Sequence, residues 1–440
     1  MENNTVKVGL VGFGTIGGGV ADILLNKKED IRRRTGKSIE LVKICDKDTT
    51  SDRGVKIPGG ILTDDLSEII NSPIDIVIEL IGGLEPARTF VLDFLRAGKD
   101  VVTANKALVA NHGPELFDEA RRLGRTIAFE ASVCGGIPIL SSIATSLQAN
   151  TIMSIDAICN GTSNFILSQM EGKGADYDDA VKEAQRLGYA EANPSMDVDG
   201  TDAVQKLTIM AQLAFGVKTD WRSIPRTGID IVKALDIRFA RRLGKRIRLL
   251  ATAKRVGCDT QNQAAPAGVE LKVSPTLVPE TSPLAKVCDA FNAVQIIGDF
   301  VGPVFYQGLG AGRKPTASAV CSDVIDTALG RTRTTFGALN LWSPDRESVP
   351  VIEPDATAEK AYLRFKVEDH PGVLAKTTGI LGQHGISISS LLQDAAEDGT
   401  GANLIILTHE APSGQLAAAI EEIDESSFVL EKTVKMSVRD

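Results

Sequence analysis

The first 135 residues alternate short apolar runs with helical segments. The apolar run at residues 6–11 leads into a glycine turn, after which Val20, Ile23 and Leu24 recur at helical spacing. Further strand-like runs lie at residues 39–45, 74–81, 100–103 and 125–129. Parallel strands joined by helices produce this alternation, because each connecting helix covers one face of the sheet. The pattern predicts a doubly wound α/β domain of the Rossmann type over residues 1–135.

After residue 136 the pattern changes to longer helical segments mixed with β-rich runs. Helices are expected at residues 180–187, 201–215 and 233–242, and strands at 247–256 and 268–278. This mixture predicts a separate α+β domain over residues 136–310. A glycine turn then opens a helix at about 311–330, which we expect to return to the first domain.

The last part of the chain follows a third pattern. Residues 340–358 contain several proline and acidic residues and are predicted to form a linker. Over residues 359–440, strand-like and helical segments follow in the order βαββαβ, which is typical of a small ferredoxin-like domain. This tail is long enough to fold as a unit of its own.

Composition narrows the possible partners. A chain of 440 residues exceeds what one core supports, so two or three domains are expected. The net charge of −9 argues against a nucleic-acid or anionic-membrane partner and favours a small-molecule substrate. The six cysteines lack metal-ligand or disulfide spacing, and the sequence shows neither a signal-peptide pattern nor a long apolar run. We therefore expect a cytoplasmic protein that binds neither nucleic acid nor a membrane.

Gly12, Gly14 and Gly17 form a GxGxxG motif between the first strand and the first helix. Such glycines permit a tight turn, the approach of a pyrophosphate and close helix packing, and the helix N-terminus attracts phosphate. Together with the intervening Phe13, Thr15 and Ile16, they predict a site for NAD or NADP. The alternative is a glycine-rich turn with only a packing role.

Acidic and basic residues follow two of the predicted parallel strands. Asp46 stands where an acid bonds the ribose hydroxyls of NAD, although Lys47 and Arg53 could reach the extra phosphate of NADP. The cofactor preference leans slightly to NAD. Alternatively, Asp46 belongs to an ordinary acidic turn with no role in cofactor binding. Asn105 and Lys106 follow another strand, at the edge where ligands of such sheets bind.

Five acidic residues precede one lysine in the stretch GYAEANPSMDVDGTDAVQK, residues 188–206. Gly188 should end one helix, and a second should begin near residue 201 with Asp199 as a cap. Asp202 and Lys206 are four residues apart and share a helix face that continues as an apolar stripe. A surface ion pair is the simplest explanation. A buried carboxylate and lysine need partners, however, so we favour a functional site.

Glu130 precedes the glycine-rich turn VCGGIP. A carboxylate and the carbonyls of a tight loop can hold a hard monovalent cation. Alternatively, Gly135 and Gly136 simply turn the chain. Cys134 raises a third possibility, a thiolate nucleophile, but no neighbouring basic residue would lower its pKa.

The stretch at residues 188–206 closely resembles the signature of homoserine dehydrogenases. The resemblance covers about residues 5–330, through VGFGTIGGGV, TANKALVA, EASVCGGIPI and GLGAGRKPTASAV. The tail, with VEDHPGVLAKTTGILGQHGISI, resembles an ACT domain, a module that senses amino acids. The resemblance implies a catalytic and dimerising α+β domain that reduces L-aspartate 4-semialdehyde to L-homoserine with NADH or NADPH. This reaction belongs to threonine, methionine and isoleucine biosynthesis.

The resemblance also implies roles for individual residues. Lys206 matches the proton donor, Asp202 its substrate-binding and catalytic partner, and Lys106 a second active-site lysine. Glu191 matches the group that binds the substrate ammonium, and Asp197 adds a further negative charge for this zwitterion. The remaining cofactor-binding positions are Thr103, Asn105, Gly188, Gly308 and Gly310. The cation site, sodium-like, matches Glu130 with the main-chain carbonyls of Val133, Gly135 and Ile137.

The tail suggests regulation. An end-product amino acid, threonine first, is the expected effector, near residues Asp369, His370, Gly372 and His384. The tail could instead serve only to dimerise the enzyme, for which a homodimer or homotetramer is expected. Two rivals remain for the whole protein: a semialdehyde dehydrogenase that uses Cys134 with phosphate, and a non-catalytic sensor of dinucleotide and amino acid.

Overall fold

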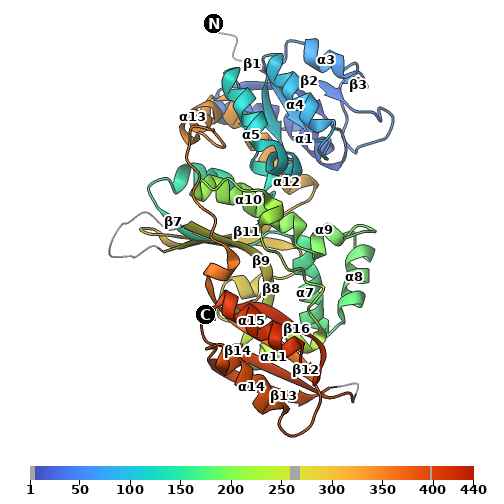
Figure 1. Ribbon diagram of the computed structural model, residues 1–440. Coiled ribbons are helices and arrows are strands. Elements are labelled where there is room, and N and C mark those ends of the chain that lie inside the picture. The colour runs from blue at the N-terminus through green and yellow to red at the C-terminus, as the bar shows by residue number, and fades with distance from the viewer. Residues whose placement is uncertain (1–4, 258–267, 397–398) are drawn as a thin grey trace. The chain divides into compact units, whose positions relative to one another are not determined.

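A computed structural model describes residues 5–257, 268–396 and 399–440 (Figure 1). The chain forms two compact units, and neither is continuous in sequence. The first contains residues up to 153 together with 204–223 and 291–349. The second contains 154–203, 224–290 and 350–440. Each unit therefore gathers segments that lie far apart along the chain.

The first unit is built on a six-stranded parallel sheet with the order β3-β2-β1-β4-β5-β6. Its strands are β1 (Thr5–Val11), β2 (Ser38–Cys45), β3 (Leu62–Thr63), β4 (Ile76–Glu79), β5 (Asp100–Thr103) and β6 (Ile127–Ala128). This is the strand order of a doubly wound dinucleotide-binding sheet. The predicted Rossmann domain is confirmed.

Helices cover the sheet of the first unit (Figure 1). They are α1 (Thr15–Asn26), α2 (Lys28–Thr35), α3 (Leu66–Asn71), α4 (Ala87–Arg96), α5 (Lys106–Arg122), α12 (Arg313–Ala328) and α13 (Arg331–Leu339). Helix α12, from much later in the chain, contributes Ala317, Val320 and Val324 to the core that also contains Val20 of α1. Short helical segments η1 (Glu130–Ser132), α6 (Ile139–Ser141), η2 (Ser142–Ser146) and η3 (Trp221–Ser223) and the hairpin β10 (Phe291–Gly298) to β11 (Gly302–Leu309) complete the unit.

Helix α2 lies in a charged stretch for which the sequence predicted no element. Ile31 is its one buried residue, so apolar periodicity is absent. Exposed pairs one turn apart, Arg32 with Glu29 and Arg33 with Asp30, support the helix instead.

The sheet of the second unit runs in the order β7-β8-β9-β16-β12-β14-β13. Its strands are β7 (Ile152–Ile158), β8 (Lys245–Val256), β9 (Gly268–Pro279), β12 (Ala358–Val367), β13 (Ile388–Ala395), β14 (Ala402–Thr408) and β16 (Val429–Val438), and the short β15 (Ala411–Pro412) pairs with β12. The last strand, β16, lies parallel to β9 through Ser437 opposite Thr276 and Val438 opposite Leu277. The strands of the tail therefore belong to the same sheet as β8 and β9.

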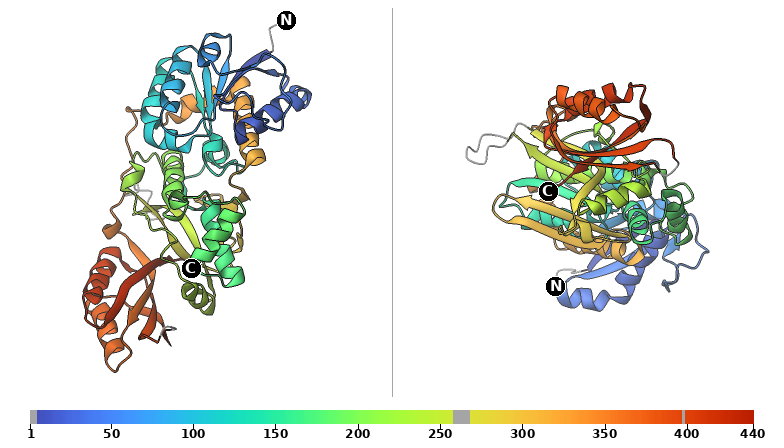
Figure 2. Two further views of the ribbon diagram at one scale, coloured as in Figure 1. Left: turned by 90° about the vertical axis from the view of Figure 1, so that its right-hand side faces the viewer. Right: turned by 90° about the horizontal axis from the view of Figure 1, so that it is seen from below.

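The tail has the predicted βαββαβ fold. Helices α14 (Val373–Gln383) and α15 (Ser413–Asp424) pack on one face of its sheet, over a core that includes Leu363 and Phe365 of β12 (Figure 2). Tyr362 and Arg364 alternate with them and so point to the other face. There both side chains donate hydrogen bonds to Asp236 of α11 (Ala234–Arg242), at 2.7 and 2.9 Å.

The other helices of the second unit are α7 (Gly161–Lys173), α8 (Tyr177–Arg186), α9 (Ser195–Val198), η4 (Leu284–Lys286) and η5 (Pro354–Ala356). Helix α10 (Thr201–Phe215) begins in this unit and continues into the first. Over the described residues, no helix combines the length and apolar character that a membrane span requires.

Candidate active site

The glycine turn after β1 has the shape that a dinucleotide needs. Gly12 has φ +97°, and a Cβ atom there would lie 2.6 Å from the main chain of Leu80. A Cβ at Gly17 would lie 2.1 Å from the carbonyl oxygen of Gly12. Nothing lies within 4 Å of the Cβ position of Gly14, directly before α1. The turn is therefore closely packed at Gly12 and Gly17 and open at Gly14. The open side faces the N-terminus of α1, where a pyrophosphate binds.

Asp46 follows β2 and holds the glycine turn. Its carboxylate accepts a short hydrogen bond from the N–H of Phe13 and a second, at 2.9 Å, from the N–H of Asp48. Arg53 donates to Asp48 at 2.8 Å. The expected acid therefore stands at the edge of the turn, with a guanidinium nearby that is already engaged by a carboxylate.

The end of β5 is organised by a buried glutamate that the sequence reasoning missed. The carboxylate of Glu79, at the end of β4, accepts from Thr103 Oγ1 at 2.6 Å and from the N–H of Ile81 at 2.9 Å. Thr103 in turn accepts from the N–H of Asn105 at 3.0 Å. Burial raises the pKa of the Glu79 carboxyl. An acid that closes the apolar run IVIE was the available signal.

Lys106 begins α5 directly after this network. Asn105 caps the helix by accepting from the N–H of Leu108 at 3.1 Å, and its amide donates to the carbonyl of Gly83 at 2.7 Å. Lys106 is half-buried. The structure thus fixes the main chain on which this lysine stands.

The loop between α8 and α10 is anchored on α7. Thr162 Oγ1 donates to the carbonyl of Tyr189 at 2.7 Å, and Ser163 Oγ donates to the carbonyl of Asp197 at 2.7 Å. The ring of Tyr189 stacks on Phe165, with 4.6 Å between the centroids. Part of the expected loop is the short helix α9, which begins directly after Pro194. Asp199 accepts from the N–H of Thr201 at 2.7 Å, as expected for a cap.

Two of the predicted carboxylates meet at one amide. Asn160 Nδ2 donates to Asp197 Oδ1 and to Asp202 Oδ2, both at 2.8 Å, so the two acceptor oxygens lie at most twice that distance apart. Asp202 is 6% exposed. Two carboxylates at such a separation repel each other, and a cation stabilises them. Asn160 was missed because it also has the ordinary role of capping α7, where it accepts from the N–H of Ser163.

The remaining predicted site residues between 188 and 206 are Lys206, Glu191 and Gly188. Lys206 is half-buried and lies one turn after Asp202 along α10. Glu191 is exposed, with its main-chain carbonyl accepting from Gln185 at 3.2 Å. Gly188 ends α8 with φ +77°. In the second unit, then, Asp197 and Asp202 converge through Asn160, and Glu191 stands on the exposed loop.

Glu130 lies in η1 and is buried. Its two carboxylate oxygens accept from the N–H groups of Leu140 and Ser141, at 2.9 and 2.6 Å. Its own N–H donates to Asp323 at 2.8 Å. Burial raises the pKa of the Glu130 and Asp323 carboxyls, and their mutual repulsion adds to the shift at Asp323. Both line a cavity of about 600 Å³ in the first unit.

The glycine turn after Glu130 packs against the loop after β11. A Cβ at Gly135 would lie 2.5 Å from the carbonyl oxygen of Gly310, and Gly136 donates to the carbonyl of Leu309 at 2.9 Å. The carbonyl of Ile137 accepts from the N–H of Ile139 at 2.8 Å. Cys134 has φ +54° and is only 1% exposed, which does not suit a nucleophile that must meet substrate. Among the described residues, no cluster of three or more His, Cys, Asp or Glu side chains could hold a metal.

The four residues expected near an effector do not form one group. Asp369, His370 and Gly372 lie in the loop between β12 and α14, which lines a cavity of about 380 Å³. His384 follows the other end of α14, about 16 Å along the helix, and contacts Glu422 at 2.8 Å. His370 contacts Glu368 at 2.9 Å.

A Rossmann sheet and an open glycine turn in the first unit, with two carboxylates held by one amide in the second, are features of an NAD(P)-dependent oxidoreductase. Family models agree: residues 12–130 match the NAD-binding domain of homoserine dehydrogenase, 138–325 match homoserine dehydrogenase and 361–425 match the ACT domain. The chain belongs to the homoserine dehydrogenase family. Its activity is the NAD(P)-dependent interconversion of L-aspartate 4-semialdehyde and L-homoserine, and its ACT domain is consistent with regulation by an amino acid.

Relatives cover nearly the whole chain. Homoserine dehydrogenase of Neisseria gonorrhoeae is 40% identical over 98% of this chain and 98% of its own length. That of Pseudomonas aeruginosa is 41% identical, again over 98% of both. The crystal structure of a homoserine dehydrogenase from Thiobacillus denitrificans is 41% identical, with a TM-score of 0.90 over 99% of this chain and 98% of that one. A hyperthermophilic archaeal homoserine dehydrogenase solved in complex with NADPH is 27% identical, with a TM-score of 0.60, and covers 74% of this chain and 98% of its own.

Proposed function

We propose that Lys206 donates the proton in aldehyde reduction, that Asp202 orients it, and that Lys106 is the second lysine of the site. Asp197 and Glu191 bind the substrate ammonium in this proposal. The observation that carries it is the pair of carboxylates, Asp197 and Asp202, held by Asn160 at the start of the helix that bears Lys206. Two carboxylates held at this spacing attract an ammonium group, and an amino-acid substrate carries one.

A dinucleotide bound at the glycine turn would supply the hydride for aldehyde reduction and would accept it in homoserine oxidation. As the new C–H bond forms at the aldehyde carbon, negative charge develops on the aldehyde oxygen. The Lys206 ammonium transfers its proton to that oxygen and becomes a neutral amine, and L-homoserine leaves with a hydroxyl. In the direction of homoserine oxidation, the neutral amine takes the hydroxyl proton. Lys106 stabilises the developing charge without transferring a proton.

The test is homoserine oxidation by Lys206→Ala. We expect turnover to fall at least about 100-fold while the dissociation constant of NAD(P)H, measured by fluorescence, changes little. Lys182→Ala, an exposed lysine of α8, is the matched control. A loss of turnover below about 10-fold would reject Lys206 as the proton donor.

We propose that Asp46 favours NAD over NADP, because its carboxylate at the end of β2 would repel a phosphate on the adjacent ribose. Measurement of kcat/KM with both cofactors tests this. Asp46→Ser should lower the ratio for NAD over NADP. A higher ratio in that variant would contradict the assignment.

We also propose a sodium-like cation at Glu130 and the carbonyls of Val133, Gly135 and Ile137. The tight turn supports it, since Cys134 and Gly135 both have positive φ. The fit is partial, because the Glu130 oxygens and the Ile137 carbonyl already accept N–H groups. Replacing sodium by choline should lower the melting temperature of the wild type more than that of Glu130→Gln. Equal shifts would argue against the cation.

For the ACT domain we propose an amino-acid effector, threonine first, at the loop that contains Asp369, His370 and Gly372. The cavity beside this loop supports the assignment, and the position of His384 beyond the far end of α14 leaves that residue out of it. Inhibition assays with threonine, methionine and isoleucine, and calorimetry with the inhibitor found, test it. We further propose a homodimer or homotetramer, which light scattering resolves.

A further inference from the structure

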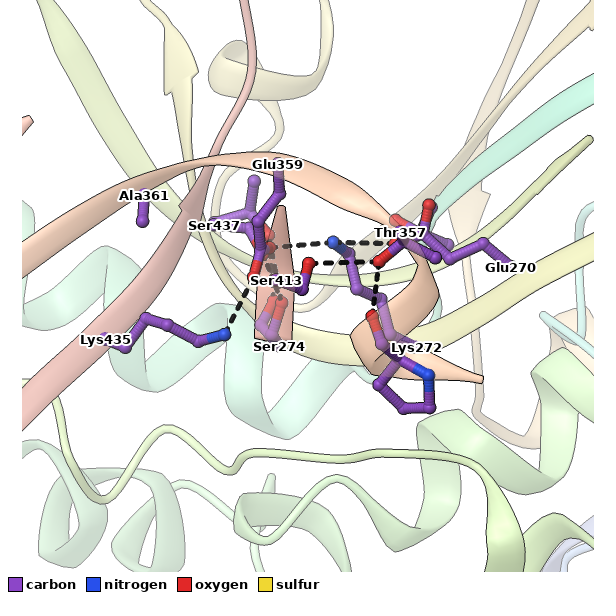
Figure 3. Close-up of polar contacts among 12 residues, drawn as sticks. Glu270, Lys272, Ser274, Thr357, Glu359, Ala361, Ser413, Lys435 and Ser437 are labelled. Atoms are coloured by element: carbon purple, nitrogen blue, oxygen red, sulfur yellow. Dashed lines mark hydrogen bonds and ion pairs between the residues drawn. The ribbon is translucent and has the colours of Figure 1, made fainter. Parts of the chain in front are cut away.

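Charged side chains form a largely buried cluster where the ACT strands meet β9 (Figure 3). Lys272 of β9 lies 2.9 Å from Glu270 of the same strand and 3.0 Å from Glu359 of β12. Lys435 of β16 lies 2.7 Å from the other oxygen of Glu359, and Ser437 donates to Glu359 at 3.0 Å. We call Glu270, Lys272, Glu359 and Lys435 the docking cluster. It joins the ACT domain to β9 by charge as well as by strand pairing.

Three of the four side chains of the docking cluster are largely enclosed. Those of Lys272, Glu270 and Glu359 are 17%, 11% and 10% exposed, whereas that of Lys435 is 40% exposed. Burial alone would raise the pKa of Glu359, but Lys272 and Lys435 outweigh it and hold the value at about 2. Charges out of water are costly unless each has partners, so this geometry resists displacement of either strand. Lys272 is the one residue of the cluster that bonds carboxylates on both sides of the junction.

The strand that carries Lys272, β9, also supports the segment that contains Asp197 and Asp202. One edge of β9 pairs with β8 along its whole length. On the other edge, Thr276 and Leu277 pair with β16 of the ACT domain, and Val273 pairs with residues 225–227. Val273 accepts from the N–H of Thr227 at 2.8 Å and donates to the carbonyl of Pro225 at 3.0 Å. The same edge of β9 therefore pairs with β16 at Thr276 and with residues 225–227 at Val273, three positions earlier.

The segment beside Val273 contacts the residues that surround the paired carboxylates. The N–H of Ile229 donates to the carbonyl of Val198 at 2.8 Å. A Cβ at Gly228 would lie 2.4 Å from the same carbonyl oxygen. Gly200, two residues before Asp202, packs on Val273 itself, because its Cβ position lies 3.2 Å from Val273 Cγ1. Val198 and Gly200 lie between Asp197 and Asp202 in sequence. Val198 therefore contacts the segment with Gly228 and Ile229, and Gly200 packs against β9.

We propose that Lys272 is a positioning residue that couples the ACT domain to substrate binding. Lys272 ties Glu359 to β9, and the next residue, Val273, supports the turn from which Asp197 and Asp202 reach Asn160. A change in the ACT domain that shifts β12 or β16 alters the spacing of these carboxylates. Its first effect falls on binding of the substrate ammonium, and its effect on cofactor binding is small. The regulatory half of this inference rests on the amino-acid effector proposed above.

The experiment compares Lys272→Met, Lys272→Arg and Glu359→Gln in the full-length enzyme. Lys286→Met, which removes an exposed lysine of the same unit, is the matched control. KM and kcat for homoserine, the dissociation constant of NAD(P)H, and inhibition by threonine, methionine or isoleucine are measured for each. For Lys272→Met we expect KM for homoserine to rise about 3- to 10-fold with kcat changed less than about 2-fold. Lys272→Arg should restore the wild-type values.

Inhibition gives the second readout. Lys272→Met and Glu359→Gln should each raise the half-inhibitory concentration at least about 10-fold, and the double variant should add little, because both break one link. Unchanged KM and inhibition in folded Lys272→Met would overturn the proposal, as would equal changes in Lys286→Met. Glu359→Gln keeps the Lys272–Glu270 pair and serves if Lys272→Met does not fold. If no amino acid inhibits the wild type, the proposed effector fails, and the KM of the Lys272 variants still decides the positioning role.

Discussion

Glu359→Gln should destabilise the protein in a pH-dependent way. The folded protein holds the pKa of Glu359 at about 2, against 4.5 for an ordinary glutamate. This difference corresponds to about 3 kcal/mol of stability from ionised Glu359. Because the pKa is lowered in the folded state, the contribution is fully present above about pH 5 and is lost as the pH falls towards 2. The variant should therefore lose about 3 kcal/mol at pH 7 but only about 1 kcal/mol at pH 3.

Urea unfolding at the two pH values measures this difference, read from the transition in which the ACT strands separate from β9. Glu410→Gln, which changes an exposed glutamate outside the docking cluster, controls for the change of charge. It should shift the midpoint little at either pH, because an exposed charge is well solvated. A loss of stability in Glu359→Gln that is the same at pH 7 and pH 3 would refute the electrostatic reasoning. Such a result would assign the effect to packing or to the hydrogen bond from Ser437.

Three further predictions concern the site and the tail. Asn160→Ala should raise KM for homoserine at least about 10-fold with cofactor affinity unchanged, since it removes the donor shared by Asp197 and Asp202; an unchanged KM would detach Asn160 from substrate binding. Cys134→Ser should keep turnover within about 3-fold of wild type, because the thiol is buried, and steady-state assays would expose any larger loss. Removal of residues 350–440 should abolish inhibition and also lower the melting temperature, because it uncovers an edge of β9 and the buried charges of Glu270 and Lys272; unaltered thermal stability would contradict the continuous sheet.

Local patterns were sufficient for much of the fold. The glycine motif and the strand–helix alternation predicted the Rossmann domain, and α10 begins and ends at the residues expected. The six elements of the ACT domain also follow the predicted order. These features depend on interactions between residues close in sequence, such as helix caps, turns and the alternation of apolar side chains. The helix α2 was missed for the same reason, because exposed ion pairs support it in place of an apolar face.

The candidate site was predictable as a set of residues but not as a geometry. The motifs singled out Asp197, Asp202 and Lys206 as chemical groups. Asn160 carries no special signal, since an asparagine before a helix is an ordinary cap. Glu79 has only the weak signal of an acid at the end of an apolar run. Its role becomes visible when β4 and β5 lie side by side, with Thr103 between its carboxylate and Asn105.

The sequence by itself determined the class of enzyme, the three kinds of domain and the chemical groups available for catalysis. Only the tertiary structure decided that β16 completes the sheet beside β9 and that Lys272 meets Glu359 across that junction. The return of α12 to the first domain was expected, but only the structure showed that it packs against α1, more than 280 residues earlier. The physical reason is that helices and turns are fixed by neighbours in sequence. Strand pairing and buried ion pairs depend instead on which distant segments exclude water together, and no local pattern records that choice.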